Sequence, residues 1–274
     1  MTLANLVLRS MPKRIGRDVV VKTIPIRDGL HAYLMEEKNT REDQPCLVYF
    51  HGGGFVFPAS RYHVYNAAEY VRTGCKVLFV DYRLAPKHTY PTANEDCFAA
   101  YLWALEQNEY HIDKTRLALG GDSAGGYLAA DVMRRIHESA LTPPKLLLLI
   151  YPVLDARMQT PSMREYCDMP MWNSRLNRKM WELFLHGTAV ISPSENADVS
   201  YFPPVYLETA QFDCLHDEGA AFVDLLRSQS VDVNFVETKG TMHGYDIVQK
   251  SPISQNSLQL RCNALKGAWG AVQE

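Results

Sequence analysis

The chain has 274 residues, of which 47% are hydrophobic and 22% are charged, and its net charge is -3. This composition is typical of a globular protein that buries a substantial core, and the charge balance argues against nucleic acid as a partner. No apolar run approaches the roughly 18 residues of a membrane span, so we expect no membrane partner. Six widely spaced cysteines show no metal-ligand pattern, which predicts reduced thiols, no metal and a cytoplasmic location.

The N-terminal part of the chain is predicted to form two extended segments, 18–26 and 30–36, joined by a turn at Arg27-Asp28-Gly29. After this hairpin, short apolar segments alternate with patterns of helical length. We expect further strands at 46–50, 76–80, 116–120, 145–152, 204–209 and 231–237, and helices at about 62–72, 94–108, 124–138, 218–227 and 254–272.

This alternation predicts the fold class. Short apolar strands that alternate with helices form mainly parallel sheets with helices on both faces. No repeat or linker divides the sequence. We therefore predict a single α/β domain over 1–274, with an eight-stranded, mostly parallel sheet flanked by helices.

The segment from Asp155 to about Ser200 interrupts the alternation, because it contains no strand pattern. A helix over 174–185 would bring Trp181 and Phe184 to neighbouring positions. Either this helix only packs on the core, or it belongs to a lid over the carboxyl ends of the strands, where ligands bind in such sheets. In the second interpretation, lid elements lie in about 1–17 and 156–200, and Trp181 and Phe184 wall the substrate pocket.

Ser123 lies on the turn between a predicted strand and the helix 124–138, within Gly121-Asp122-Ser123-Ala124-Gly125. The pattern matches G-x-S-x-G, in which the glycines allow a sharp turn that exposes the serine hydroxyl. The N-terminus of the following helix favours negative charge at the same place. The motif predicts a nucleophile, while the alternative is a glycine-rich turn without a chemical role.

The sequence His51-Gly52-Gly53-Gly54 directly follows another predicted strand. Consecutive glycines can turn their N–H groups toward an oxyanion without obstruction, and such a loop forms half of the oxyanion hole in α/β hydrolases. We predict that Gly52 or Gly53, together with Ala124, donates to the oxyanion. His51 is predicted to shape this loop by a hydrogen bond rather than to act as a base.

A serine nucleophile needs a base and a carboxylate that orients the base, and in this fold they follow in the order Ser, Asp or Glu, His. Asp213 lies just beyond one predicted strand, and His243 lies on a glycine-bracketed loop beyond the next. Ser123, Asp213 and His243 thus form the predicted triad. The alternatives are His216 and Asp217, but their position at the start of a helix gives them a simple capping role.

Together these motifs resemble the hormone-sensitive lipase-like family of α/β hydrolases, the bacterial family IV esterases. The resemblance implies the α/β-hydrolase fold, the same roles for Ser123, Asp213 and His243, and a small-molecule ester as substrate. Cys214 and Tyr127 depart from the residues common in the family, and the short N-terminal segment implies a reduced lid. The matching sequences, in family order over about 47–245, are HGGGF, VDYRLAP, YPTANED, GDSAGG, YPVLD, FPPVYLETAQFDCLHDEG and MHGY.

We expect a carboxylesterase for short-chain acyl esters, because a reduced lid can cover only part of a cleft. An amidase, or a deacetylase acting on an acylated small molecule or sugar, would use the same acyl-transfer chemistry. This hydrolytic mechanism requires no cofactor. His243 argues against a non-enzymatic receptor, since hormone-binding relatives have lost this histidine. The strand at 231–237 is expected at a sheet edge that needs cover, which favours a homodimer.

Overall fold

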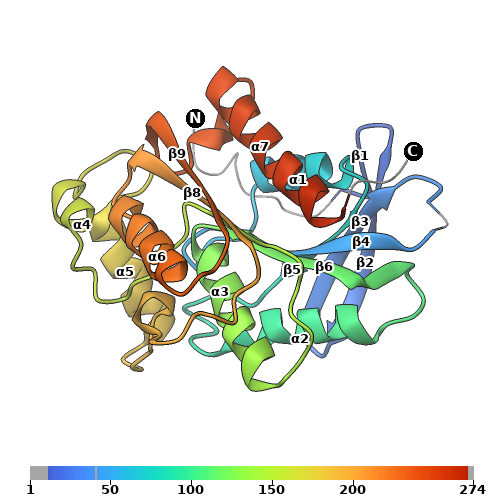
Figure 1. Cartoon of the computed structure of the whole chain (residues 1–274), viewed down its shortest axis with the longest axis horizontal. Helices are drawn as coiled ribbons and strands as arrows, with labels where there is room; N and C mark the ends of the chain where they lie inside the picture. Colours follow the sequence, from blue (N-terminus) through green and yellow to red (C-terminus); the bar gives the residue numbers. More distant parts are fainter. Residues whose placement is uncertain (1–11, 41, 271–274) are drawn as a thin grey trace.

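The computed structural model describes residues 12–40 and 42–270, which build a sheet of nine strands flanked by helices (Figure 1). The spatial order is β1-β2-β3-β5-β4-β6-β7-β8-β9. The pairings from β1 to β3, and that of β3 with β5, are antiparallel, whereas all the others are parallel. The strands are β1 Arg14–Ile15, β2 Val19–Arg27, β3 Leu30–Glu37, β4 Gln44–Phe50, β5 Lys76–Asp81, β6 Ile112–Asp122, β7 Leu147–Ile150, β8 Val205–Phe212 and β9 Val233–Met242.

The sheet contains one strand more than the eight predicted. The additional strand, β1, has only two residues, which pair with the start of β2 across a turn at Gly16, where φ is +67°. Two residues carry no periodic pattern, so the sequence cannot reveal such a strand. Within the predicted lid range 1–17, β1 lies at the sheet edge opposite β9, and residues 1–11 lie outside the described residues.

Helices cover both faces of the sheet, as the alternating pattern predicts. Helices α1 and α7 pack on one face, where they share a hydrophobic cluster, and α2, α3 and α6 pack on the other. In Figure 1 the first pair lies above the sheet and the other three lie below it. These helices are α1 Arg61–Val71, α2 Thr92–Glu106, α3 Ala124–Glu138, α6 His216–Ser228 and α7 Pro252–Ala268.

The segment between β7 and β8 contains no strand among its described residues, as expected. It contains α4 Pro161–Glu165, α5 Ser174–Leu185 and the short 3-10 helix η2 Pro193–Glu195, which lie beyond one end of the sheet. The predicted helix 174–185 is confirmed. It begins where the side chain of Asn173 accepts a hydrogen bond from the Leu176 N–H at 3.1 Å, which satisfies a free N–H of the first turn.

The core is formed mainly by the central strands, since Cys46–Phe50 of β4 and all of β7 are buried. All six cysteines are free. Five of them are buried, and Cys167, between α4 and α5, is partly exposed. Among the described residues, no helix is both long and apolar enough to cross a membrane, and no group of side chains there could hold a metal ion.

Candidate active site

Ser123 joins β6 to α3 in a backbone conformation that a serine rarely adopts, with φ +54° and ψ -119°. Such a conformation costs about 1–3 kcal/mol and persists only where the surroundings hold it. Here the Ser123 N–H donates to the Ile150 carbonyl at 2.9 Å. The Ser123 carbonyl accepts from the N–H groups of Gly126 and Val153, both at 3.0 Å.

The glycines of the motif are required by close backbone contacts. A Cβ atom at Gly121 would overlap the carbonyl of Gly125, and a Cβ atom at Gly125 would overlap the carbonyl oxygen of Phe50 in β4. The first turn of α3 therefore lies directly against the end of β4. This packing supports the interpretation of the motif as a sharp strand–helix turn that presents Ser123.

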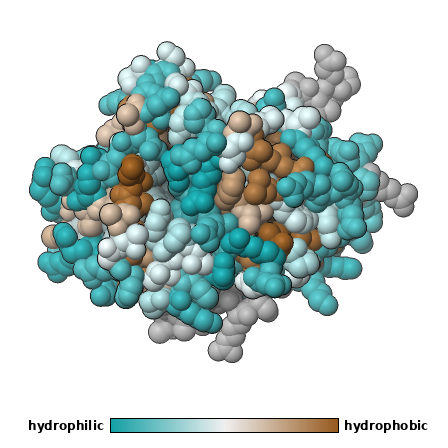
Figure 2. All heavy atoms as spheres, turned by 90° about the horizontal axis from the view of Figure 1, so that it is seen from below, coloured by the Kyte–Doolittle hydropathy of each residue, from teal (hydrophilic) through white to brown (hydrophobic). Residues whose placement is uncertain are grey.

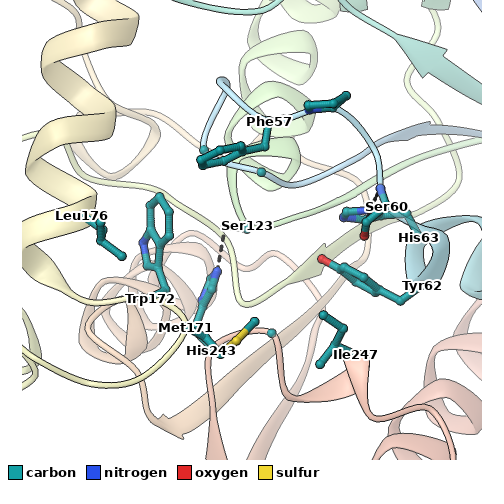
Figure 3. Close-up of a pocket in the computed structure, with 14 residues that line it drawn as sticks. Phe57, Ser60, Tyr62, His63, Ser123, Met171, Trp172, Leu176, His243 and Ile247 are labelled. Carbon is teal, nitrogen blue, oxygen red and sulfur yellow. Dashed lines mark hydrogen bonds between the residues drawn. The ribbon is translucent and has the colours of Figure 1, made fainter. Parts of the chain in front are cut away.

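The structure brings the three predicted triad residues into one hydrogen-bonded line. His243 Nε2 lies 2.9 Å from Ser123 Oγ (Figure 3). On the other side of the ring, His243 Nδ1 lies 2.6 Å from Asp213 Oδ2. Asp213 follows β8 and His243 follows β9, so both side chains reach the carboxyl edge of the sheet where β6 ends. The N–H of Leu215 donates to Asp213 Oδ1 at 3.0 Å and fixes the carboxylate.

The alternative residues His216 and Asp217 are engaged elsewhere. Asp217 Oδ2 accepts a hydrogen bond from the Ser162 N–H at 2.8 Å, at the start of α4. His216 Nδ1 lies 2.8 Å from Asp217 Oδ1. These contacts differ from the expected capping of α6, which has no side-chain cap among the described residues, because the Asp217 carboxylate binds the first turn of α4 instead.

The glycine loop after β4 requires one correction. The N–H of Gly52 donates to Asp122 Oδ1 at 3.0 Å, so Gly52 is not available as an oxyanion donor. The next two glycines, Gly53 and Gly54, line the pocket beside Ser123. Sequence spacing alone could not distinguish them, because the choice depends on which N–H the buried Asp122 accepts. Ala124 begins α3, and the first N–H groups of a helix have no partner within it.

Asp122 is the anchor of this loop. Its carboxylate accepts hydrogen bonds from Tyr49, Tyr62 and His63 as well as from Gly52, at 2.7 to 3.1 Å. Burial alone raises the pKa of Asp122, but His63 and these hydrogen bonds hold the pKa well below its usual range. The ionised carboxylate therefore ties the glycine loop to the strand that carries Ser123.

His51 is buried and contacts the same loop. Its Nδ1–H donates to the Gly52 carbonyl at 2.6 Å, and its ring stacks on Tyr82 with the centroids 4.5 Å apart. Burial, together with nearby His63, lowers the pKa of His51 to about 4. The geometry agrees with the predicted role of His51 in shaping the loop.

A cavity of about 300 Å³ opens beside Ser123 and His243. The indole of Trp172 forms one wall, 5.9 Å from the His243 ring, and its Nε1–H donates to Asn177 Oδ1 at 3.3 Å. Figure 3 shows Phe57, Leu176 and Ile247 around the opening. The lining residues are Gly53, Gly54, Phe57, Pro58, Ser60, Tyr62, His63, Ser123, Met171, Trp172, Leu176, His243, Gly244 and Ile247.

The prediction that Trp181 and Phe184 wall this pocket is wrong. Both are buried one layer behind it: Phe184 stacks on Phe55 at 3.9 Å between centroids, and Trp181 meets the edge of Tyr127 at 5.4 Å. The helical spacing of the apolar residues correctly predicts that both side chains lie on the buried face of α5. The wall comes instead from Trp172, just before the helix, where no periodic pattern could identify it.

Hydrophobic residues also gather in separate patches on an otherwise mainly hydrophilic face of the molecule (Figure 2). Three of the large apolar side chains that remain exposed, Phe57, Met171 and Leu176, belong to the pocket. They give the cavity an apolar entrance.

The mostly parallel sheet, its covering helices and the sharp turn at Ser123 are those of an α/β hydrolase. A family model described as alpha/beta hydrolase fold matches residues 47–247, and the chain belongs to this family, within its hormone-sensitive lipase-like branch of esterases. The resemblance in the motifs is thereby confirmed.

Named relatives of this chain include esterases. Esterase LipI of Mycobacterium tuberculosis is 34% identical over 211 residues, which cover 74% of this chain and 66% of LipI, so the chain spans about two thirds of that relative. Ethyl acetate hydrolase of Pseudomonas putida is 32% identical over 81% of this chain and 74% of its own length. The crystal structure of carboxyl esterase 2 from Tuber melanosporum superposes with a TM-score of 0.87 at 29% identity, covering 96% and 90% of the two chains.

Proposed function

We propose that this protein is a carboxylesterase that hydrolyses short-chain acyl esters through a covalent acyl-enzyme. The observation that carries the proposal is the line of hydrogen bonds from Ser123 through His243 to Asp213. This line opens onto a largely apolar cavity. A nucleophile within hydrogen-bonding reach of a base, which a third group orients, is the arrangement that activates a serine.

In the first half of the reaction, Ser123 Oγ attacks the ester carbonyl while His243 Nε2 takes the hydroxyl proton. Asp213 holds the imidazole in the tautomer with the proton on Nδ1 and stabilises the imidazolium that forms. The N–H groups of Gly53, Gly54 and Ala124 would donate to the developing oxyanion. Each such donor contributes about 3 kcal/mol in comparable enzymes.

The imidazolium of His243 then gives its proton to the leaving alkoxide as the ester C–O bond breaks, so the alcohol departs and the acyl-enzyme remains. In the second half, water attacks the acyl-enzyme with His243 again acting as base, which releases the carboxylic acid and restores the Ser123 hydroxyl. The atoms balance with water as the only co-reactant.

The preference for short acyl groups follows from the size and openness of the cavity. Each methylene buried against its walls contributes about 0.8 kcal/mol, but a cavity of about 300 Å³ accommodates only a few of them beside the ester group. A longer chain would extend into water and gain nothing more. Similarity to ethyl acetate hydrolase supports a small substrate.

The test is a panel of chromogenic esters from acetyl to palmitoyl, assayed below their solubility limits, with Ser123→Ala as the matched control. We expect kcat/KM to peak between acetyl and hexanoyl, and Ser123→Ala to lose about 10⁶-fold in kcat. A preference for palmitoyl esters would contradict the short-chain proposal. A folded Ser123→Ala protein that keeps a tenth of the activity would contradict the nucleophile. Faster cleavage of the matching anilides would favour the amidase alternative.

The homodimer that the edge of the sheet favours also stays a prediction. β9 forms one edge of the sheet among the described strands, and an edge strand can pair with a second copy of the chain. Light scattering at micromolar concentration would distinguish a homodimer from a monomer.

A further inference from the structure

Beneath the base loop lies a buried cluster of charges that the proposed mechanism does not use. Arg261 of α7 is fully buried, and its guanidinium donates to Glu208 at 2.6 and 3.0 Å and to Asp246 at 2.7 Å. Burial alone lowers the pKa of Arg261, but the two carboxylates raise it well above its usual range. Replacing buried ion pairs with apolar residues is often neutral or stabilising. The cluster therefore calls for an explanation beyond stability.

The first connection between this cluster and His243 runs along the chain. Asp246 belongs to the 3-10 helix η3 Tyr245–Ile247, only three residues after His243. Besides Arg261, it accepts a hydrogen bond from Asn66 of α1 at 3.1 Å. The loop that carries the base is thus tied to α1 and α7.

The second connection runs through Tyr151, which follows β7. Its hydroxyl donates to Asp246 Oδ1 at 2.6 Å, and its N–H donates to the Glu208 carbonyl at 2.7 Å. Its ring lies 4.8 Å from the His243 ring at an interplanar angle of 61°. The hydroxyl of Tyr151 is therefore held by Asp246 and its backbone N–H by Glu208. Arg261 binds both of these residues, and the Tyr151 ring contacts the imidazole.

We propose that Tyr151 is a positioning residue for His243, held in place by the Arg261–Asp246 pair; this inference rests on the proposed function. The hydrogen bonds to Asp213 and Ser123 hold the two ring nitrogens. The side-chain torsion that turns the ring is broad in histidine, however, and rotation of the ring would break the bond to Ser123. The Tyr151 ring removes that freedom and keeps Nε2 directed at Ser123. A displacement of about 1 Å in such a site can cost about a hundredfold in rate.

The test compares Tyr151→Phe with the matched control Tyr206→Phe. Tyr206 is equally buried, and its hydroxyl donates to Glu208 at 3.0 Å within the same cluster, so each variant loses one hydrogen bond to a buried carboxylate. We expect both to lower Tm similarly. Only Tyr151→Phe should lower kcat, by about five- to tenfold with KM within twofold, because its ring is no longer fixed beside His243. The downfield proton resonance of the His243–Asp213 hydrogen bond should broaden in that variant alone.

Equal kcat values for the two variants, or a loss that lies wholly in KM, would overturn the proposal. Arg261→Lys provides a second variant, since lysine keeps the charge but cannot bind both carboxylates with the same geometry. It should also lower kcat with KM unchanged, and a folded variant with wild-type kcat would count equally against the positioning role. Ser123→Ala is assayed alongside. If Ser123→Ala is active, the proposed function fails. If Ser123→Ala is inactive but Tyr151→Phe and Tyr206→Phe have equal kcat values, only the positioning role is overturned.

Discussion

Ser123 and His243 border the same cavity as the wall around Trp172, but the two parts of the molecule originate in different ways. Ser123, Asp213 and His243 each follow a strand, and the parallel sheet brings the ends of β6, β8 and β9 to one edge. The wall around Trp172 comes from the segment between β7 and β8, which contains no strand. In the proposed function, the sheet therefore positions the reacting side chains, while the segment between β7 and β8 supplies one wall of the cavity that a substrate would enter.

The largest expected effect is that of Asp213→Asn, which tests whether the chemistry depends on the residues at the strand ends. The amide cannot hold the imidazole in the required tautomer or stabilise the imidazolium, so kcat should fall about 10⁴-fold. Asp217→Asn is the control, because Asp217 binds α4 instead, and its kcat should stay within twofold of wild type. Similar losses in both variants, measured on one acetyl ester, would refute the assignment of Asp213.

A smaller effect is expected from Trp181→Ala in α5, within the segment between β7 and β8. Trp181 is buried against Phe55 and Tyr127, so its removal should lower the free energy of unfolding by about 3–5 kcal/mol. The relative preference among acyl chain lengths should not change, since Trp181 does not line the cavity. Urea unfolding and the ester panel measure the two quantities. An altered chain-length profile with intact stability would restore Trp181 to the pocket wall.

Through His51 in the glycine loop, the free energy of unfolding of the protein should vary with pH by about 3 kcal/mol. His51 stays neutral in the folded protein down to about pH 4, whereas an unfolded histidine takes up its proton near pH 6.5. Between these values the unfolded chain binds more protons, so the free energy of unfolding falls as the pH decreases. His51→Asn should make this dependence shallower by one proton in urea titrations at pH 4 to 6.5. An unchanged slope would rule out His51 as its source.

The smallest effect is expected from Trp172→Ala, which should widen the cavity without unfolding the core. The ratio of kcat/KM for hexanoyl over acetyl esters should change by about tenfold, since removing the indole alters the burial of one or two methylenes. Leu176→Ala, at the more exposed part of the same wall, should change this ratio less. If neither variant changes the ratio, acyl length is not selected at this wall.

The sequence predicts the sheet and the three residues that the structure brings together, because both depend on local patterns. Ser123 is marked by glycines that close packing requires, and Asp213 and His243 are marked by their places after strands. The glycine pattern does not reveal that the Gly52 N–H binds Asp122, because this contact joins residues seventy positions apart in the chain. Trp172 was missed for a similar reason, since its side chain enters the cavity from a loop.

The distribution of the thiols has a practical consequence for following the segment between β7 and β8 in solution. Five of the six cysteines are buried, and burial raises their pKa above that of an ordinary thiol. Thiolates are the reactive form, so these five should react slowly while the protein is folded. Cys167 alone is partly exposed, and it lies between α4 and α5. The natural sequence thus offers one preferred attachment point for a fluorescent or spin label, located in the segment that forms the pocket wall.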